Sequence, residues 1–71
     1  MKSYLKISRS LGDIVYRVIN GVVEYTFYKD SWNSSAYTWN EITREFQDKS
    51  TSRFMTEDEY FGELVMRELV N

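Results

Sequence analysis

The sequence predicts a small α+β domain in which a three-stranded antiparallel meander carries two helices on one face, in the order β-β-β-α-α. Two observations favour this fold class. An Asn-Gly dipeptide separates two β-rich runs in the first half of the chain, and two Thr-x-x-Glu motifs precede amphipathic stretches in the second half. The 71 residues are expected to form one domain, residues 1–71. A chain of this size buries only about 60% of the surface that its unfolded form exposes, so its core is small.

The hairpin signal is Asn20-Gly21, which joins the runs Ile14–Ile19 and Val22–Tyr28. Asn-Gly favours the two positive φ angles of a type I′ turn and is the strongest local indication of a β-hairpin. A two-residue turn fixes the register, so Tyr16 should lie opposite Tyr25. Every pair on that face is then apolar or aromatic, and a slip by one residue would destroy the pattern.

A preceding strand is expected at Tyr4–Arg9, joined to the hairpin through residues 10–13. Pairing Arg9 with Ile14 would place Ile7 beside Tyr16 and extend the same apolar face. The predicted core face consists of alternate residues from the three strands: Leu5, Ile7, Ile14, Tyr16, Val18, Val23, Tyr25 and Phe27.

Two capping boxes mark the starts of the helices. Thr38 and Thr56 each precede a glutamate by three residues, and apolar residues flank both motifs. In this arrangement the hydroxyl and the carboxylate satisfy backbone N–H groups that otherwise lack partners. We therefore predict helices at about Trp39–Gln47 and Glu57–Val70.

Helical periodicity predicts which side of each helix is buried. The first helix should bury Trp39, Ile42 and Phe46, and the second should bury Tyr60, Phe61, Leu64, Val65 and Leu69. The predicted outer face of the second helix carries Glu59, Glu63 and Arg67. The segment Arg53-Phe54-Met55 is ambiguous, because short apolar runs fit more than one structure, and a short fourth strand is the alternative there.

The composition excludes several kinds of chemistry. The chain has no Cys and no His, so it offers no disulfide, no thiol nucleophile and no imidazole base. The Glu57-Asp58-Glu59 cluster falls in the first turn of a predicted helix, where acids complement the helix dipole. We expect a protein that is not an enzyme, with no catalytic residues, metal site or cofactor.

The charge distribution favours a protein partner with a basic surface. Residues 41–71 carry eight acids and four bases, and complementary charge gives specificity and fast association. The candidate contact residues are acids on or between the two helices: Glu41, Glu45, Asp48, Glu57, Asp58, Glu59 and Glu63. In the extreme, such a surface imitates the phosphates of nucleic acid. We expect a regulator or inhibitor of a larger protein.

Small acidic phage-encoded inhibitors share this general style, being short and rich in acids and aromatic residues. No specific motif ties the chain to such a family. The expectation of a phage or mobile-element origin therefore depends only on this similarity in length and composition. The absence of an apolar run long enough for a signal peptide or a membrane span favours a cytoplasmic protein with no membrane partner.

Two further surfaces are candidates for binding. Trp32 lies in a polar loop, where it either covers the core or, if it is exposed, is the best single candidate for a contact residue. The sheet face without helices would present an open surface formed by Tyr4, Lys6, Arg17, Ile19 and Val22. This open face gives two alternatives: a single-stranded nucleic-acid binder, disfavoured by the overall acidity of the chain, and a structural homodimer.

Overall fold

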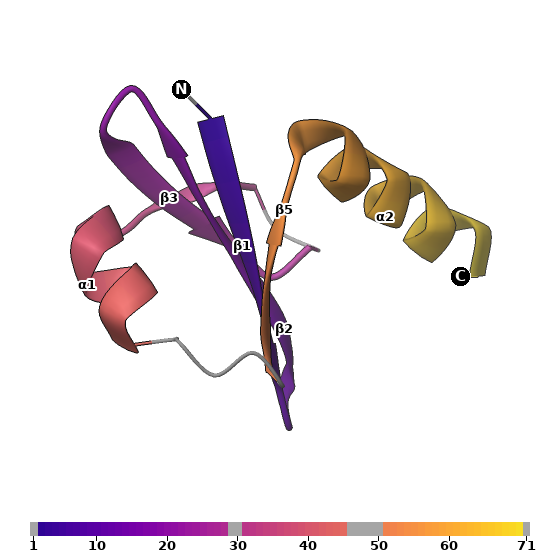
Figure 1. Cartoon of the computed structure of the whole chain (residues 1–71). Coiled ribbons are helices and arrows are strands. Elements are labelled where there is room, and N and C mark those ends of the chain that lie inside the picture. Colours follow the sequence, from indigo (N-terminus) through magenta and orange to yellow (C-terminus); the bar gives the residue numbers. More distant parts are fainter. Residues whose placement is uncertain (1, 29–30, 46–50, 71) are drawn as a thin grey trace.

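The computed structural model describes residues 2–28, 31–45 and 51–70 and shows a five-stranded antiparallel sheet with two helices (Figure 1). The strand order is β4-β3-β2-β1-β5. The elements are β1 (Lys2–Arg9), β2 (Gly12–Ile19), β3 (Val22–Thr26), β4 (Asn33–Ser34), α1 (Trp39–Glu45), β5 (Ser52–Met55) and α2 (Glu57–Val70). The predicted α+β class and the antiparallel meander are confirmed.

The β2–β3 hairpin forms in the predicted register. Tyr16 pairs with Tyr25, and Arg17 pairs with Glu24. Asn20 has φ 50° and Gly21 has φ 82°, which are the positive angles that a type I′ turn requires.

The predicted register between β1 and β2 is wrong by two residues. Arg9 pairs with Gly12 rather than with Ile14, and Leu5 lies opposite Tyr16. The strands are joined by a tight turn at residues 10–11, after which Gly12 adopts φ 126°. A shift of two residues returns every side chain to the same face, so the apolar alternation could not distinguish the two registers.

Two strands extend the meander at its edges. The alternative of a fourth strand near Arg53–Met55 is confirmed, because β5 pairs antiparallel with β1 and places Met55 opposite Tyr4. The two-residue strand β4, which the sequence did not indicate, pairs with the outer edge of β3. As a result β1 and β3, which are the edges of the meander, lie inside the sheet together with β2.

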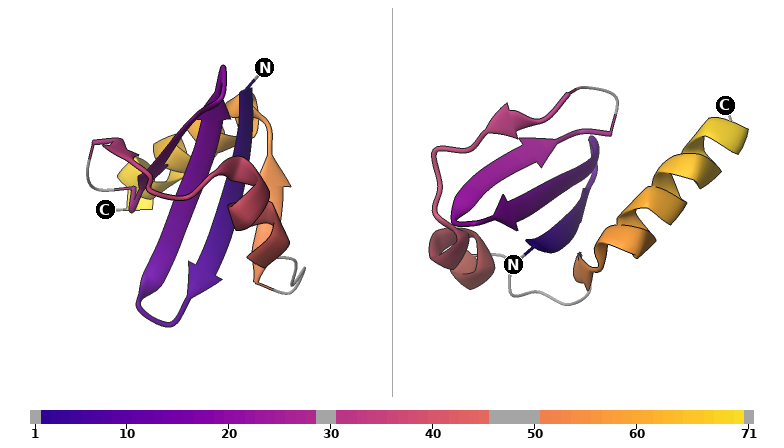
Figure 2. Two further views of the ribbon diagram at one scale, coloured as in Figure 1. Left: turned by 90° about the vertical axis from the view of Figure 1, so that its left-hand side faces the viewer. Right: turned by 90° about the horizontal axis from the view of Figure 1, so that it is seen from above.

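The two helices lie on opposite faces of the sheet, so the expectation that both cover one face is wrong (Figure 2). Ile42 of α1 joins the first core cluster, defined as Leu5, Ile7, Ile14, Tyr16, Val18, Val23 and Ile42. Tyr60 of α2 joins the second core cluster, defined as Tyr4, Val15, Met55 and Tyr60. The reason is local: Met55 ends β5 with its side chain among the second cluster, and α2 begins two residues later.

The predicted core face is otherwise accurate. Six of its eight residues are buried in the first core cluster, and Tyr25 packs against that cluster. Phe27 is the exception: it follows the end of β3 and is 41% exposed, with its ring beside the Arg9 guanidinium.

Both helices start as predicted. The Thr38 backbone N–H donates to Glu41 Oε1 at 3.2 Å, and the Glu41 N–H donates to Thr38 Oγ1 at 3.2 Å. The Thr56–Glu59 box makes the same two bonds at 3.0 and 3.1 Å. The predicted last turn of the first helix, including Phe46 and Gln47, lies outside the described residues. No helix in the described parts of the chain is long and apolar enough to cross a membrane.

Candidate functional site

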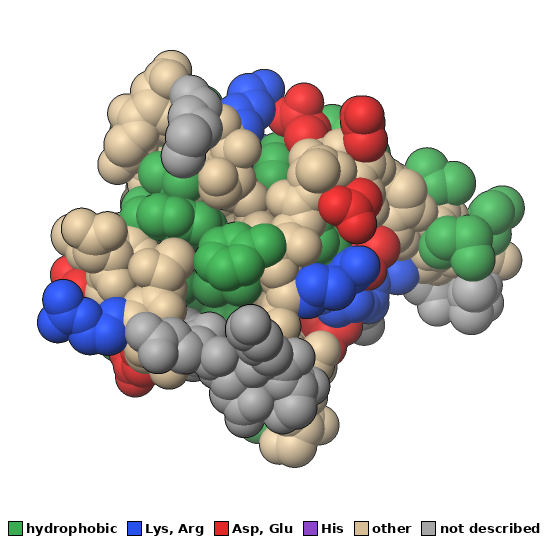
Figure 3. All heavy atoms as spheres, in the orientation of Figure 1, with side chains coloured by type: hydrophobic (Ala, Val, Ile, Leu, Met, Phe, Trp, Pro, Cys, Tyr) green, Lys and Arg blue, Asp and Glu red, His purple; other side chains and the backbone are tan. Residues whose placement is uncertain are grey.

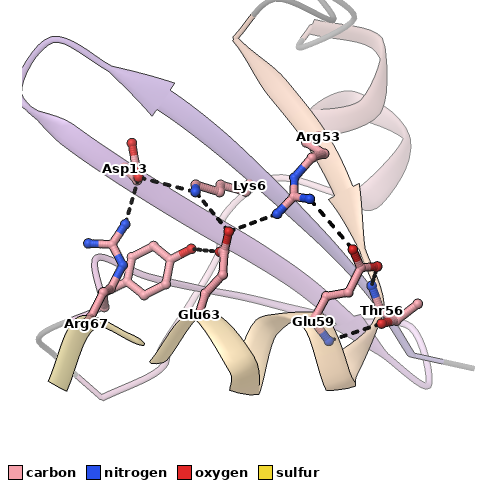
Figure 4. A network of polar contacts seen from close by, with 8 residues as sticks. Lys6, Asp13, Arg53, Thr56, Glu59, Glu63 and Arg67 are labelled. Atoms are coloured by element: carbon pink, nitrogen blue, oxygen red, sulfur yellow. Dashed lines mark hydrogen bonds and ion pairs between the residues drawn. The ribbon is translucent and has the colours of Figure 1, made fainter. Parts of the chain in front are cut away.

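A layer of charged side chains joins α2 to the sheet (Figure 4). Glu63 Oε1 accepts hydrogen bonds from Lys6 Nζ at 3.1 Å and from Arg53 Nη2 at 2.8 Å. The other oxygen, Oε2, accepts from the Tyr28 hydroxyl at 2.8 Å. One turn further along α2, Arg67 Nη2 donates to Asp13 Oδ2 at 2.8 Å. These contacts clamp the middle of α2 over β1 and β2.

The layer shifts the pKa values of Glu63 and Tyr28. Burial by itself raises the pKa of the Glu63 carboxyl, but the hydrogen bonds from Tyr28 and Lys6 outweigh it and hold the pKa below its ordinary value. Burial, together with the bond to Glu63, raises the pKa of the Tyr28 hydroxyl. Glu63 is therefore charged and Tyr28 protonated at neutral pH, which suits a structural clamp.

Replacing Glu63 by glutamine should flatten the acid side of the stability profile. Because the folded-state pKa of Glu63 lies below its unfolded value, its contribution is present above about pH 4.5 and is lost as pH falls through the folded pKa. At pH 7 the Glu63→Gln variant should lose about 1–3 kcal/mol, as expected for hydrogen bonds to a charged group. Urea unfolding between pH 3 and 7 measures both effects.

Part of the acid slope should remain in Glu63→Gln, because the pKa values of Glu57 and Glu59 are also lowered, chiefly by hydrogen bonds from Lys2 and from Thr56 respectively. A variant with the same slope as the parent would show that Glu63 is not held as described. Asp58→Asn is a suitable control, since Asp58 takes part in none of the ion pairs among the described residues.

The same clamp rotates α2 about its axis relative to the predicted orientation. Tyr60 is buried and Leu64 is partly buried, as expected. However, Glu63 and Arg67 point toward the sheet rather than toward solvent. The reason is that the surface beneath α2 carries Lys6, Asp13 and Tyr28, which bind Glu63 and Arg67 of the helix.

Apolar side chains consequently lie on the outside of α2. Phe61 is 50% exposed, Val65 55%, Met66 61% and Leu69 76%. Phe61, Val65 and Leu69 follow the i, i+4, i+8 spacing of one helical row. Together with Gly62 these four residues define the outer α2 face. Figure 3 shows hydrophobic side chains gathered at the C-terminal end of α2, which runs away from the sheet edge in Figures 1 and 2.

Within α2 itself, the charged residues next to the outer α2 face in the helical projection are the acids Asp58 and Glu68. Arg67 is the only base in α2, and its guanidinium is held by Asp13 and lies 3.7 Å from the centre of the Tyr28 ring. Asp58 and Glu68 are exposed. Neither takes part in an ion pair among the described residues.

Gly62 has no structural explanation within the described parts of the chain. It lies in the interior of α2, where glycine is less stable than alanine, and a Cβ built on it meets no atom within 4 Å. Gly62→Ala should therefore raise the free energy of unfolding by about 0.5–1 kcal/mol, measured by urea unfolding.

Gly12→Ala is the matched control for that substitution. It also finds open space, but Gly12 has φ 126°, so alanine there should destabilise the protein by about 1 kcal/mol or more. If Gly62→Ala lowered stability instead, a group of the free protein would have to pack against Gly62.

The predicted acidic surface is divided between two faces of the molecule. Glu41 and Glu45 are on α1, whereas the α2 acids lie on the far side of the sheet. Several of these acids have internal partners: Glu57 binds Lys2 and Tyr4, Glu59 closes a capping box, and Glu63 forms the clamp. Asp48 lies outside the described residues. The expectation of one acidic surface over adjacent helices is therefore wrong.

The sheet face that was expected to be open is covered by α2. Tyr4 is buried and stacks on Tyr60 with ring centroids 5.1 Å apart. Lys6 is paired with Glu63, and Arg17 with Glu24. Ile19 is partly buried, and Val22 alone among the five predicted residues of this face is exposed.

Trp32 covers the second core cluster. Its ring packs against Tyr4 and Tyr60 at centroid distances of 6.2 and 5.5 Å. The Arg17 guanidinium lies 3.9 Å from the centre of the indole ring on another side. Trp32 is therefore partly buried as a lid rather than presented as an isolated contact residue.

Sequence reasoning missed Gly62, Met66 and Glu68 as candidate contact residues. The available signal was the row Phe61, Val65 and Leu69, which periodicity alone assigns to a core. Comparisons with protein-family models, with curated proteins and with solved structures gave no match. Function is therefore inferred from the arrangement of these side chains.

Proposed function

We propose that this protein is a non-enzymatic docking module that binds another protein through the outer α2 face and regulates or inhibits it. The observation that carries this proposal is the orientation of α2, which directs Glu63 and Arg67 to the sheet and leaves four large apolar side chains in solvent. Contiguous exposed apolar surface on a small protein is typical of an interaction site.

The form of the surface favours recognition by insertion of a helix into a groove or against another helix. In this mode a partner contacts apolar residues spaced at i, i+3, i+4 and i+7, and the outer α2 face has this spacing. Because α2 is already folded and clamped, binding does not have to order it, which lowers the entropic cost of association.

The residues that favoured the nucleic-acid alternative already make contacts within the protein. Tyr4 is buried beneath α2, and the cationic groups of Lys6 and Arg17 already bind carboxylates. A phosphate backbone would have to compete with these internal pairs and would meet Asp58 and Glu68 on the outside of α2.

A capture experiment with matched variants tests the proposal. The tagged protein is incubated in a lysate of its source cells, and captured proteins are compared for the parent, Leu69→Glu and Leu11→Glu. Leu11 is the control, because it is also a leucine, is 97% exposed at the β1–β2 turn and is not part of the outer α2 face.

We expect a protein that is captured by the parent and by Leu11→Glu and is lost with Leu69→Glu. Circular dichroism should show that both variants are folded, since both sites are exposed. Retention of every captured protein by Leu69→Glu, or equal loss with both variants, would contradict docking through the outer α2 face.

A further inference from the structure

From the outer α2 face and its charges, we infer that the partner presents a cationic amphipathic helix, which packs across α2 at Gly62. This inference rests on the proposed function and specifies the chemistry of the partner. Two features of the described residues support it: the position of Gly62 and the sign of the charges on α2 next to the outer α2 face.

Gly62 lies in the middle of the outer α2 face, with Phe61 and Val65 on one side and Met66 on the other in the helical projection. The distance between two packed helix axes is set by the side chains at the contact, and it falls toward the short end of its range where they are small. A glycine surrounded by large apolar side chains forms a depression in the helix surface. A large side chain from a crossing helix can fill this depression.

The flanking charges indicate that the partner is basic. Asp58 precedes Gly62 by four residues and shares its side of the helix, and Glu68 follows Val65 by three. Glu68 follows Asp58 by ten positions, which corresponds to about 15 Å along the helix axis. Lys or Arg residues at a similar spacing on the partner would meet both carboxylates, neither of which takes part in an ion pair among the described residues.

A second copy of this chain fits the surface less well. Packing two outer α2 faces would bring Asp58 and Glu68 of each copy together, and the chain already has a net charge of −2.

A lipid surface also fits poorly. Amphipathic helices that bind membranes carry Lys and Arg on the polar border, which anionic headgroups attract. The border of the outer α2 face carries Asp58 and Glu68 instead, so anionic headgroups would repel it.

Synthetic helices provide a direct test. Three 18-residue peptides are titrated into the full-length 15N-labelled protein: Leu and Lys in amphipathic helical order, Leu and Glu in the same order, and Leu and Lys in scrambled order. We expect the first to shift amide signals between Asp58 and Leu69 with micromolar affinity, and the other two to bind at least tenfold more weakly.

Matched variants locate the contact on the protein. Glu68→Lys and Glu45→Lys change the charge equally, at exposed acids on α2 and α1 respectively. We expect the first to weaken the Leu-Lys helix by at least threefold and the second to leave it within twofold. Gly62→Leu should weaken it by at least tenfold, because the added side chain fills the depression.

The outcomes separate this inference from the proposed function. If the two charge variants behave alike, or the Leu-Glu helix binds as well as the Leu-Lys helix, the cationic helix is wrong, while the capture experiment with Leu69→Glu still decides whether α2 docks. If sedimentation of the protein alone shows a dimer that Leu69→Glu abolishes, the occupant is a second copy and the inference is overturned.

Discussion

Replacing Tyr60 by alanine is expected to lower the free energy of unfolding by about 3–5 kcal/mol, the range for deleting a large buried aromatic side chain. Tyr60 is buried at the centre of the second core cluster, where its ring contacts those of Tyr4, Tyr28 and Trp32 at centroid distances of 5.1, 5.9 and 5.5 Å. Tyr60 packs α2 onto the sheet together with the partly buried Leu64, so its loss should also loosen the clamp around Glu63.

Tyr60→Phe is the matched control, because it keeps the ring. We expect it to change stability by less than about 1 kcal/mol. The measurement is urea unfolding followed by Trp32 fluorescence in a Trp39→Phe background, which reports the second core cluster alone. If Tyr60→Ala unfolded at the same urea concentration as Tyr60→Phe, α2 would not be packed on this face.

The parts of the fold that the sequence predicted are those that neighbouring residues determine. The type I′ turn depends on Asn20 and Gly21 alone, and it carries the β2–β3 register with it. Each capping box is complete within four residues, and both form with the expected hydrogen bonds. These features need no information about distant parts of the chain.

The face covered by α2 depends on distant pairing and was not predictable in this way. Whether Tyr4 is open or buried depends on β5, which places Met55 opposite it and directs α2 over the same face. The β1–β2 register was ambiguous for a related reason. Two registers that differ by two residues bury the same side chains, and only the geometry at Gly12 separates them.

The candidate site was missed because α2 has two stripes that both fit a buried face. One stripe contains Tyr60 and Leu64, and the neighbouring stripe contains Phe61, Val65 and Leu69. The choice between them is made by Glu63, which binds Lys6 at a separation of 57 residues and Tyr28 at a separation of 35. Helical periodicity gives the stripes but cannot give these partners.

Replacing Ile42 by alanine is expected to lower the free energy of unfolding by about 2–5 kcal/mol, the range for truncating a buried isoleucine. Ile42 is the buried residue of α1 and packs among the strand residues of the first core cluster. The other apolar contact from α1 to this cluster is the partly buried Trp39. A seven-residue helix is too short to be stable without such packing, so α1 should fray when Ile42 is truncated.

Trp39 fluorescence in a Trp32→Phe background measures this effect on the first core cluster, with Ile42→Val expected to cost only about 0.5–1.5 kcal/mol. Leu11→Ala, at the exposed turn, should stay within about 0.5 kcal/mol of the parent. Because β1 and β2 supply residues to both core clusters, the fluorescence of each single-tryptophan background should follow one transition that coincides with the unfolding of that same protein measured by circular dichroism. Separate transitions, or an Ile42→Ala variant as stable as Leu11→Ala, would show that α1 does not share the sheet's core.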